Sequence, residues 1–217
     1  MLFRDREDAA VRMASALKHL RGSDPLVVAI PRGAVPMGAV IARELGGALD
    51  VVLVRKLSAP GNPELAVGAV DETGWTYVAD HAKGYGATSE YLRREAERQL
   101  ETIRERRKRY TAGRGPVDAA GRVVIVIDDG LATGATMIAA LHALRARAPR
   151  RLVCAVPVGS EEAVEAVRRY ADEVVCLDIP AMFCAVGQAY RSFPQVSDEA
   201  VVATLRAASG ARAESAR

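Results

Sequence analysis

The stretch VVIVIDDGLATGATM, residues 123–137, decides the fold of this chain. It begins with residues 123–127, an unbroken β-branched run typical of a central strand that is buried on both faces. Two adjacent acids, Asp128 and Asp129, follow at the carboxyl end of this expected strand. A turn of small residues then leads into an apolar helix that we expect over about residues 137–147. The pattern predicts one strand–turn–helix unit of an α/β sheet.

The turn after this strand has the chemistry of a phosphate site. In open α/β sheets, ligands bind just beyond the carboxyl ends of the strands. A glycine- and threonine-rich turn before a helix presents backbone N–H groups and hydroxyls that suit a phosphate. Two acids would repel that phosphate unless they face sugar hydroxyls or a divalent metal, so the combination describes a phosphorylated ribose. The turn residues are Gly130, Leu131, Ala132, Thr133, Gly134, Ala135 and Thr136.

This segment resembles the signature of the type I phosphoribosyltransferases, which use phosphoribosyl pyrophosphate and Mg²⁺ to transfer ribose 5-phosphate to a nitrogen nucleophile. The resemblance implies that Asp128 and Asp129 hold the ribose hydroxyls and meet the metal through ribose or water. It implies that the donor is bound continuously from Asp128 to Thr136, with its 5′-phosphate on residues 131–136. A strand–turn–helix without a ligand is the alternative, but such a turn has no reason to expose paired acids.

Two further strand ends complete the predicted site. Arg32, Gly33 and Ala34 follow a short buried strand at residues 26–30, where a type I transferase carries its pyrophosphate loop. That loop commonly holds a non-proline cis peptide, and family members often have a second glycine where this chain has Ala34. Arg55 and Lys56 close the next expected strand, at residues 51–54, in a pattern where the family's cations reach pyrophosphate. The resemblance implies that Arg32 and Lys56 act in catalysis with the acid pair; an ordinary turn and a solvated strand end are the alternatives.

Strands and helices alternate along the rest of the chain, which predicts a mainly parallel central sheet flanked by helices. We expect further strands at residues 66–70, 76–79, 152–158 and 173–177, the first two as a hairpin, and helices at residues 8–20, 35–45, 91–110, 161–170 and 198–208. The 217 residues fit one domain, 1–217.

Two segments are expected to cover the site. Water would hydrolyse an activated sugar, so a mobile cover is needed. Residues 72–115 are the candidate lid or helical insertion, because glycines precede a charged helix there. Residues 178–210 form a candidate C-terminal hood. Its aromatic side chains could stack on a base, although packing within the hood is the favoured reading; they are Phe183, Tyr190 and Phe193.

Composition favours a cytoplasmic enzyme. With 30 basic and 27 acidic residues, the net charge of +3 is too small to argue for nucleic acid. Acidic residues also interleave with the arginines of residues 91–110, which favours a solvated or subunit-facing helix. No apolar stretch approaches membrane-spanning length, and the charged start of the chain argues against a signal peptide. The three cysteines share no CxxC spacing, so we expect small core residues in a reducing compartment.

The acceptor is the least defined part of the prediction. In 6-oxopurine transferases a carboxylate precedes the Thr-Gly of the loop; here Ala132 makes the loop closer to the adenine type. The wider pattern, including residues 3–6, 60–64 and 186–190, resembles a group of bacterial phosphoribosyltransferases and implies no particular acceptor. We expect a Mg²⁺-dependent transferase acting on a nucleobase or related nitrogen compound, in a homodimer because the family generally associates. A non-catalytic regulatory protein that binds phosphoribosyl pyrophosphate or a nucleotide is the alternative.

Overall fold

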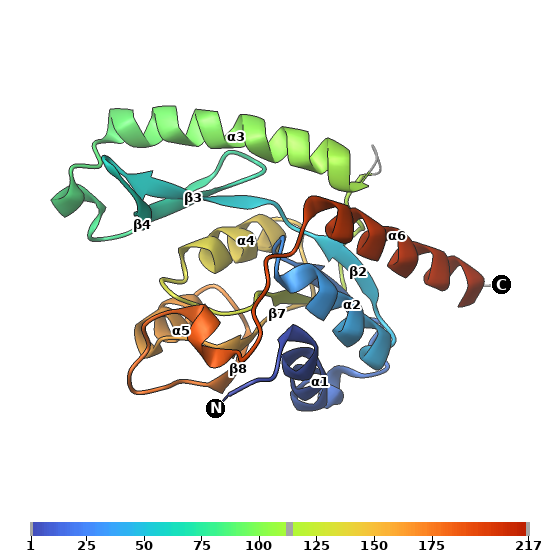
Figure 1. Ribbon diagram of the computed structural model, residues 1–217. Coiled ribbons are helices and arrows are strands. Elements are labelled where there is room, and N and C mark those ends of the chain that lie inside the picture. The colour runs from blue at the N-terminus through green and yellow to red at the C-terminus, as the bar shows by residue number, and fades with distance from the viewer. Residues whose placement is uncertain (1, 112–114, 216–217) are drawn as a thin grey trace.

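The computed structural model describes residues 2–111 and 115–215 (Figure 1). Its helices are α1 (Arg6–Ala16), α2 (Ala34–Leu45), α3 (Ser89–Thr111), α4 (Ala135–Arg145), α5 (Glu161–Arg168) and α6 (Asp198–Ser215), with short 3₁₀ turns η1 (Lys18–Leu20), η2 (Ala82–Tyr85) and η3 (Val186–Ala189). Its strands are β1 (Leu26–Ala29), β2 (Ala48–Val51), β3 (Val54–Ala59), β4 (Asn62–Asp71), β5 (Thr76–Val78), β6 (Val123–Ile127), β7 (Arg151–Val158) and β8 (Glu173–Asp178). Among the described residues, no helix is both long and apolar enough to cross a membrane.

The central sheet has five parallel strands in the order β2-β1-β6-β7-β8, which confirms the predicted α/β class. All five residues of β6 are buried, as its β-branched run predicts. Alternate residues of β6 enter two different cores. Ile125 and Ile127 pack in the core that contains residues of α1 and α2, whereas Val124 and Val126 pack in the core that contains α4. Helices therefore cover both faces of this sheet.

A second, three-stranded antiparallel sheet has the order β3-β4-β5. In Figure 1 it lies beneath the long helix α3, and α4 contacts it from the opposite side. The hairpin predicted at residues 66–70 and 76–79 is confirmed as β4 and β5. The strand predicted at residues 51–54 is wrong, because the chain leaves the central sheet after Val51 and enters the second sheet at Val54. The apolar run VVLV is continuous across this junction, so periodicity alone could not place the break.

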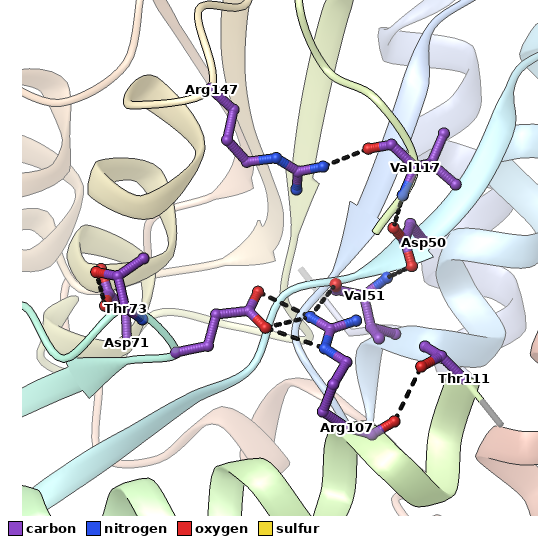
Figure 2. A network of polar contacts seen from close by, with 9 residues as sticks. Asp50, Val51, Asp71, Thr73, Arg107, Thr111, Val117 and Arg147 are labelled. Carbon is purple, nitrogen blue, oxygen red and sulfur yellow. Dashed lines mark hydrogen bonds and ion pairs between the residues drawn. The ribbon is translucent and has the colours of Figure 1, made fainter. Parts of the chain in front are cut away.

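A polar network fastens the second sheet and α3 to the end of β2 (Figure 2). The Arg107 guanidinium on α3 donates from Nε (3.0 Å) and Nη2 (2.7 Å) to the Glu72 carboxylate, which follows β4. Its Nη2 also donates to the Val51 carbonyl at 3.1 Å. Asp50 accepts hydrogen bonds from the Val51 and Val117 backbone N–H groups. The predicted lid segment thus packs through specific side-chain contacts; its residues 112–114 lie outside the described residues, and its role as a lid stays a prediction.

A stacked pair joins the second sheet to α4. The ring of Trp75, between β4 and β5, lies parallel to the His142 ring of α4, with centroids 3.6 Å apart. The buried Asp71 carboxylate accepts hydrogen bonds from the Thr73 and Trp75 backbone N–H groups, which fixes the turn that carries Trp75. Both faces of the antiparallel sheet are therefore anchored, one by α3 and the other by α4.

Candidate functional site

The sheet order places the candidate site at the point where the chain reverses its direction of winding. From β1 the chain moves outward to β2, and it later returns to the other side of β1 as β6. The carboxyl ends of two neighbouring strands with diverging connections form the crevice in which open α/β sheets bind ligands. Here those ends lead into the Arg32–Ala34 loop and into Asp128 and Asp129. The topology brings together two groups that are nearly a hundred residues apart in the sequence.

Gly33 lies in direct contact with the second acid. A Cβ atom built on Gly33 would lie 1.9 Å from Oδ2 of Asp129, so no larger residue fits without movement. The Gly33 backbone has φ −57°, which any residue adopts, so the requirement for glycine comes from close approach. The peptide bond between Pro31 and Arg32 is cis, as the family resemblance implied. The expected pyrophosphate loop and the acid pair are therefore one contiguous surface.

The two acids have different environments. Oδ1 of Asp128 accepts the Asp129 backbone N–H at 2.9 Å. Burial, followed by the neighbouring Asp129 charge, raises the pKa of Asp128 well above its usual range. Burial also raises the pKa of Asp129, but two hydrogen bonds from Arg6 to its Oδ2, at 3.0 and 2.8 Å, oppose that rise. A cation thus supports the ionised form of Asp129 at close range.

Arg6 is a site residue that sequence reasoning missed. It stands in the first turn of α1, 123 residues from Asp129 in the chain, and nothing local marks it as a partner. The resemblance included residues 3–6 but gave none of them a role. The N-terminal segment reaches the site because Phe3 pairs with Tyr190 in an isolated parallel bridge. Only the tertiary structure reveals this contact.

The hood aromatics pack against one another and against the acid strand. Tyr190 is only 6% exposed, and its hydroxyl donates to the Asp129 carbonyl at 2.7 Å. The Tyr190 ring stacks on the Phe193 ring, with centroids 4.7 Å apart. Burial raises the pKa of the Tyr190 hydroxyl. Val186 packs against Gly130, and a Cβ atom built on Gly130 would lie 2.6 Å from Cγ1 of Val186. Phe183 is partly buried against the same core. These contacts favour the packing interpretation over a base-stacking platform.

The turn after the acids is held by hydrogen bonds to neighbouring segments, and it leaves the N-terminus of α4 without a side-chain cap. The Leu131 N–H donates to the Val158 carbonyl at 2.9 Å, and the Ser160 hydroxyl donates to the Ala132 carbonyl at 2.9 Å. Gly134, with φ +76°, is the N-cap residue of α4 and provides no side-chain cap. The first turn of a helix has N–H groups without intrahelical partners, and here no capping side chain takes them. Ala132 and Thr133 are exposed, so the turn is accessible to a phosphate.

The predicted cations have protein partners. Nη1 of Arg32 lies 3.9 Å from Oδ1 of Asp198, at the start of α6. Arg55 donates from Nε to the Gln99 side chain of α3 at 2.9 Å, and burial lowers its pKa. Nζ of Lys56 lies 3.9 Å from the exposed Glu64 carboxylate of β4. Arg55 and Lys56 stand on β3 of the second sheet and not at the end of a central strand, so their contact with pyrophosphate stays a prediction.

The acid pair suits a magnesium ion that is shared with a ligand. Within the part of the chain that the structure describes, no group of three or more histidine, cysteine or acidic side chains gathers as a metal cage. Magnesium is commonly bound by one or two carboxylates together with waters and substrate phosphates, which requires no such cage. Arg6 donates its hydrogen bonds to Oδ2 of Asp129, and the Asp129 N–H donates to Oδ1 of Asp128. The donor set therefore fits Mg²⁺ held through water or sugar oxygens.

An uncapped glycine turn and a glycine loop at a switch point suit a phosphorylated ligand, and the acids beside them suit its hydroxyls or a metal ion. Comparison with known families makes this specific. Residues 5–190 match the model of the phosphoribosyl transferase domain, so the chain belongs to this family. The type I phosphoribosyltransferase fold predicted from the sequence is confirmed.

Individual relatives agree with this assignment. Two Mycobacterium tuberculosis proteins named as candidate phosphoribosyl transferases are 42% identical over 205 residues, which is 94% of this chain. The chain spans only 46% of their length. The crystal structure of TT1426 from Thermus thermophilus is 49% identical, covers 94% of this chain and 98% of its own, and has a TM-score of 0.79. AQ2163 from Aquifex aeolicus, 12% identical over 93% of this chain and 83% of its own with a TM-score of 0.52, shares the fold.

Proposed function

We propose that this protein is a Mg²⁺-dependent phosphoribosyltransferase that transfers ribose 5-phosphate from phosphoribosyl pyrophosphate to a nitrogenous base and releases pyrophosphate. Family membership supports the donor. The observation that carries the proposal is the contact between Gly33 and Asp129, because it brings the loop proposed for the leaving group beside the acids proposed for the ribose. A protein that only senses a nucleotide has no need for that loop next to those acids.

The reaction exchanges one bond at the anomeric carbon. The bond to the pyrophosphate oxygen breaks, the bond to the acceptor nitrogen forms, and positive charge develops on the sugar as in glycoside cleavage. Negative charge grows on the leaving pyrophosphate, where the Arg32 guanidinium and the backbone N–H groups of Gly33 and Ala34 stabilise it. Lys56, and Arg55 beside it, reach the pyrophosphate from the second sheet and add positive charge.

The remaining groups hold the sugar. Asp128 and Asp129 accept hydrogen bonds from the ribose hydroxyls, and the turn at residues 131–136 binds the 5′-phosphate at the end of α4. Fixing both ends of ribose 5-phosphate presents one face of the anomeric carbon to the acceptor. Mg²⁺ bound near the acids would neutralise part of the charge on the diphosphate. Ala132, where a 6-oxopurine enzyme has a carboxylate, favours an adenine-type or other acceptor. A homodimer and a cytoplasmic location complete the proposal.

Pyrophosphate release tests this function directly. Wild-type protein, donor and Mg²⁺ are incubated with a panel of nucleobases and related nitrogen compounds, and free pyrophosphate is measured. We expect base-dependent release that falls about tenfold to a hundredfold in Arg32→Ala, the value of one charge-assisted hydrogen bond. Arg43→Ala, an exposed arginine of α2, is the matched control. Donor binding without pyrophosphate release for every base would instead identify a regulatory protein.

A further inference from the structure

Arg6 joins three parts of the molecule at the acid pair. Its Nε and Nη2 donate to Oδ2 of Asp129, at 3.0 and 2.8 Å, and its Nη1 donates to the Pro194 carbonyl at 2.6 Å. Its side chain is 13% exposed. The N-terminal helix, the hood and the end of β6 therefore meet at one guanidinium.

The orientation of this guanidinium is fixed by its neighbours. The guanidinium carbon Cζ of Arg6 lies 3.7 Å from the centre of the Phe193 ring, and this ring stacks on Tyr190. Tyr190 donates its hydroxyl to the carbonyl of Asp129, so the hood holds this residue at the backbone as well. A planar guanidinium that stacks on a ring and directs two hydrogen bonds to one oxygen cannot be replaced by lysine.

Asp129 is confined on its other side by the glycine loop. Oδ2 lies against Gly33, and Nη2 of Arg6 would lie 3.0 Å from a Cβ at that position. Because Arg6 donates two of its hydrogen bonds to Oδ2, this oxygen is committed to a protein partner.

We propose that Arg6 is a positioning residue, which fixes Oδ2 of Asp129 and thereby turns Oδ1 toward a ribose hydroxyl of the donor. The inference rests on the proposed function and deepens it, since it assigns Arg6 to recognition of the sugar and not of the pyrophosphate. It also gives the N-terminal segment a role in the site.

Calorimetry with two fragments of the donor separates these roles. Ribose 5-phosphate and pyrophosphate, each with Mg²⁺, are titrated into wild type, Arg6→Gln, Arg6→Lys and the control Arg4→Gln. Arg4 is 75% exposed at the same helix end and pairs with Asp8, away from the acid pair. We expect both Arg6 variants to bind ribose 5-phosphate about tenfold more weakly, to bind pyrophosphate as wild type does, and the control to bind both normally.

A double-mutant cycle tests whether Arg6 acts through Asp129. In an Asp129→Asn background, Arg6→Gln should cause almost no further loss of ribose 5-phosphate affinity. Fully additive losses would overturn the inference, and so would a loss of pyrophosphate binding, which would mean that Arg6 contacts the leaving group itself. Arg6→Lys keeps the charge and decides the matter should Arg6→Gln not fold.

Failure of the inference and failure of the function give different results. Wild-type affinity for ribose 5-phosphate in the Arg6 variants would overturn the positioning role and leave the proposed function intact. Wild-type protein that binds neither fragment nor the full donor would overturn both.

Discussion

The carboxyl edge of the central sheet and the antiparallel layer are held in different ways. At the carboxyl edge, backbone and short side chains meet at close range, as where Gly33 touches Asp129 and Val186 covers Gly130. The layer of β3, β4, β5 and α3 is fastened by long side chains, with Arg107 on Glu72 and Trp75 on His142. We expect the close contacts to fix ligand groups, whereas the contacts of the long side chains fix one layer on another. Substitutions at the edge should therefore change ligand affinity, and those of the side chains that fasten the layer should change stability.

The largest expected effect is a difference in donor affinity between two glycine-to-alanine variants, one in each region. In Gly33→Ala, the added Cβ must displace the Asp129 carboxylate, and loss of its charge-assisted hydrogen bond to the donor should cost about tenfold to a hundredfold in donor affinity. In Gly84→Ala of η2, the added Cβ has no atom within 4 Å, and we expect wild-type affinity. Donor titration of both variants measures the difference. Equal affinities would show that the close contact has no part in binding.

The next effect is on stability alone. Arg107→Met removes the bonds to Glu72 and Val51 and leaves a partly buried carboxylate unpaired, which should cost about 2 kcal/mol of unfolding free energy. Arg93→Met, on the exposed pair with Glu97 of the same helix, should cost less than about 0.5 kcal/mol. Urea unfolding measures both, and donor affinity should stay unchanged. A large affinity loss in Arg107→Met would show that this contact also positions the layer, with Arg55 and Lys56, for donor binding.

Replacing each of the two acids at the edge with asparagine should shift the melting temperature in opposite directions. The folded-state pKa of Asp128 is raised, so its protonated form stabilises the fold. This contribution to the unfolding free energy is full below about pH 4 and is lost as the pH rises through the raised pKa. Asp128→Asn should therefore raise the melting temperature at pH 7. Asp129→Asn weakens the partner of the partly buried Arg6 and should lower stability by about 1 kcal/mol. Thermal melts at pH 7 compare them, and shifts of the same sign would contradict the distinction.

The smallest effect is a change in alkaline stability. Burial and a hydrogen bond to Asp198 raise the pKa of Tyr110 to about 12. An unfolded tyrosine ionises near pH 10, so this contribution is full below pH 10 and falls as the pH rises toward 12. Tyr110→Phe should make the loss of unfolding free energy between pH 9 and about pH 11 shallower. An unchanged slope would show that Tyr110 does not contribute to it.

Residue patterns predicted the local features, and the distant Arg32–Ala34 loop was joined to the acids only through the family resemblance. Residues 123–137 contain the buried strand, the acids and the turn within one continuous segment, so pattern and chemistry coincide there. Arg6 could not be assigned, because its partner Asp129 is 123 residues away and only the parallel bridge of Phe3 to Tyr190 brings it close. The break after Val51 was also missed, since an apolar run looks alike in either sheet.

The cysteines show the same limit. Cys154 is buried in β7, as an apolar strand predicts, and burial raises its thiol pKa. Cys176 is half-buried in β8, and Cys184 is exposed, so the expectation of a core residue was wrong for Cys184. Exposure depends on which elements cover a segment, and the short motif around Cys184 carries no information about its cover.

Calorimetric titration of wild-type protein with phosphoribosyl pyrophosphate tests the central claim most directly. We predict binding that strengthens when Mg²⁺ is added, because the diphosphate alone crowds negative charge near Asp128 and Asp129. Enzymes commonly bind substrates between about 1 μM and 1 mM, so the titration should extend to about 1 mM donor. Absence of binding at that concentration, with and without Mg²⁺, would contradict the assignment of this strand end as a donor site.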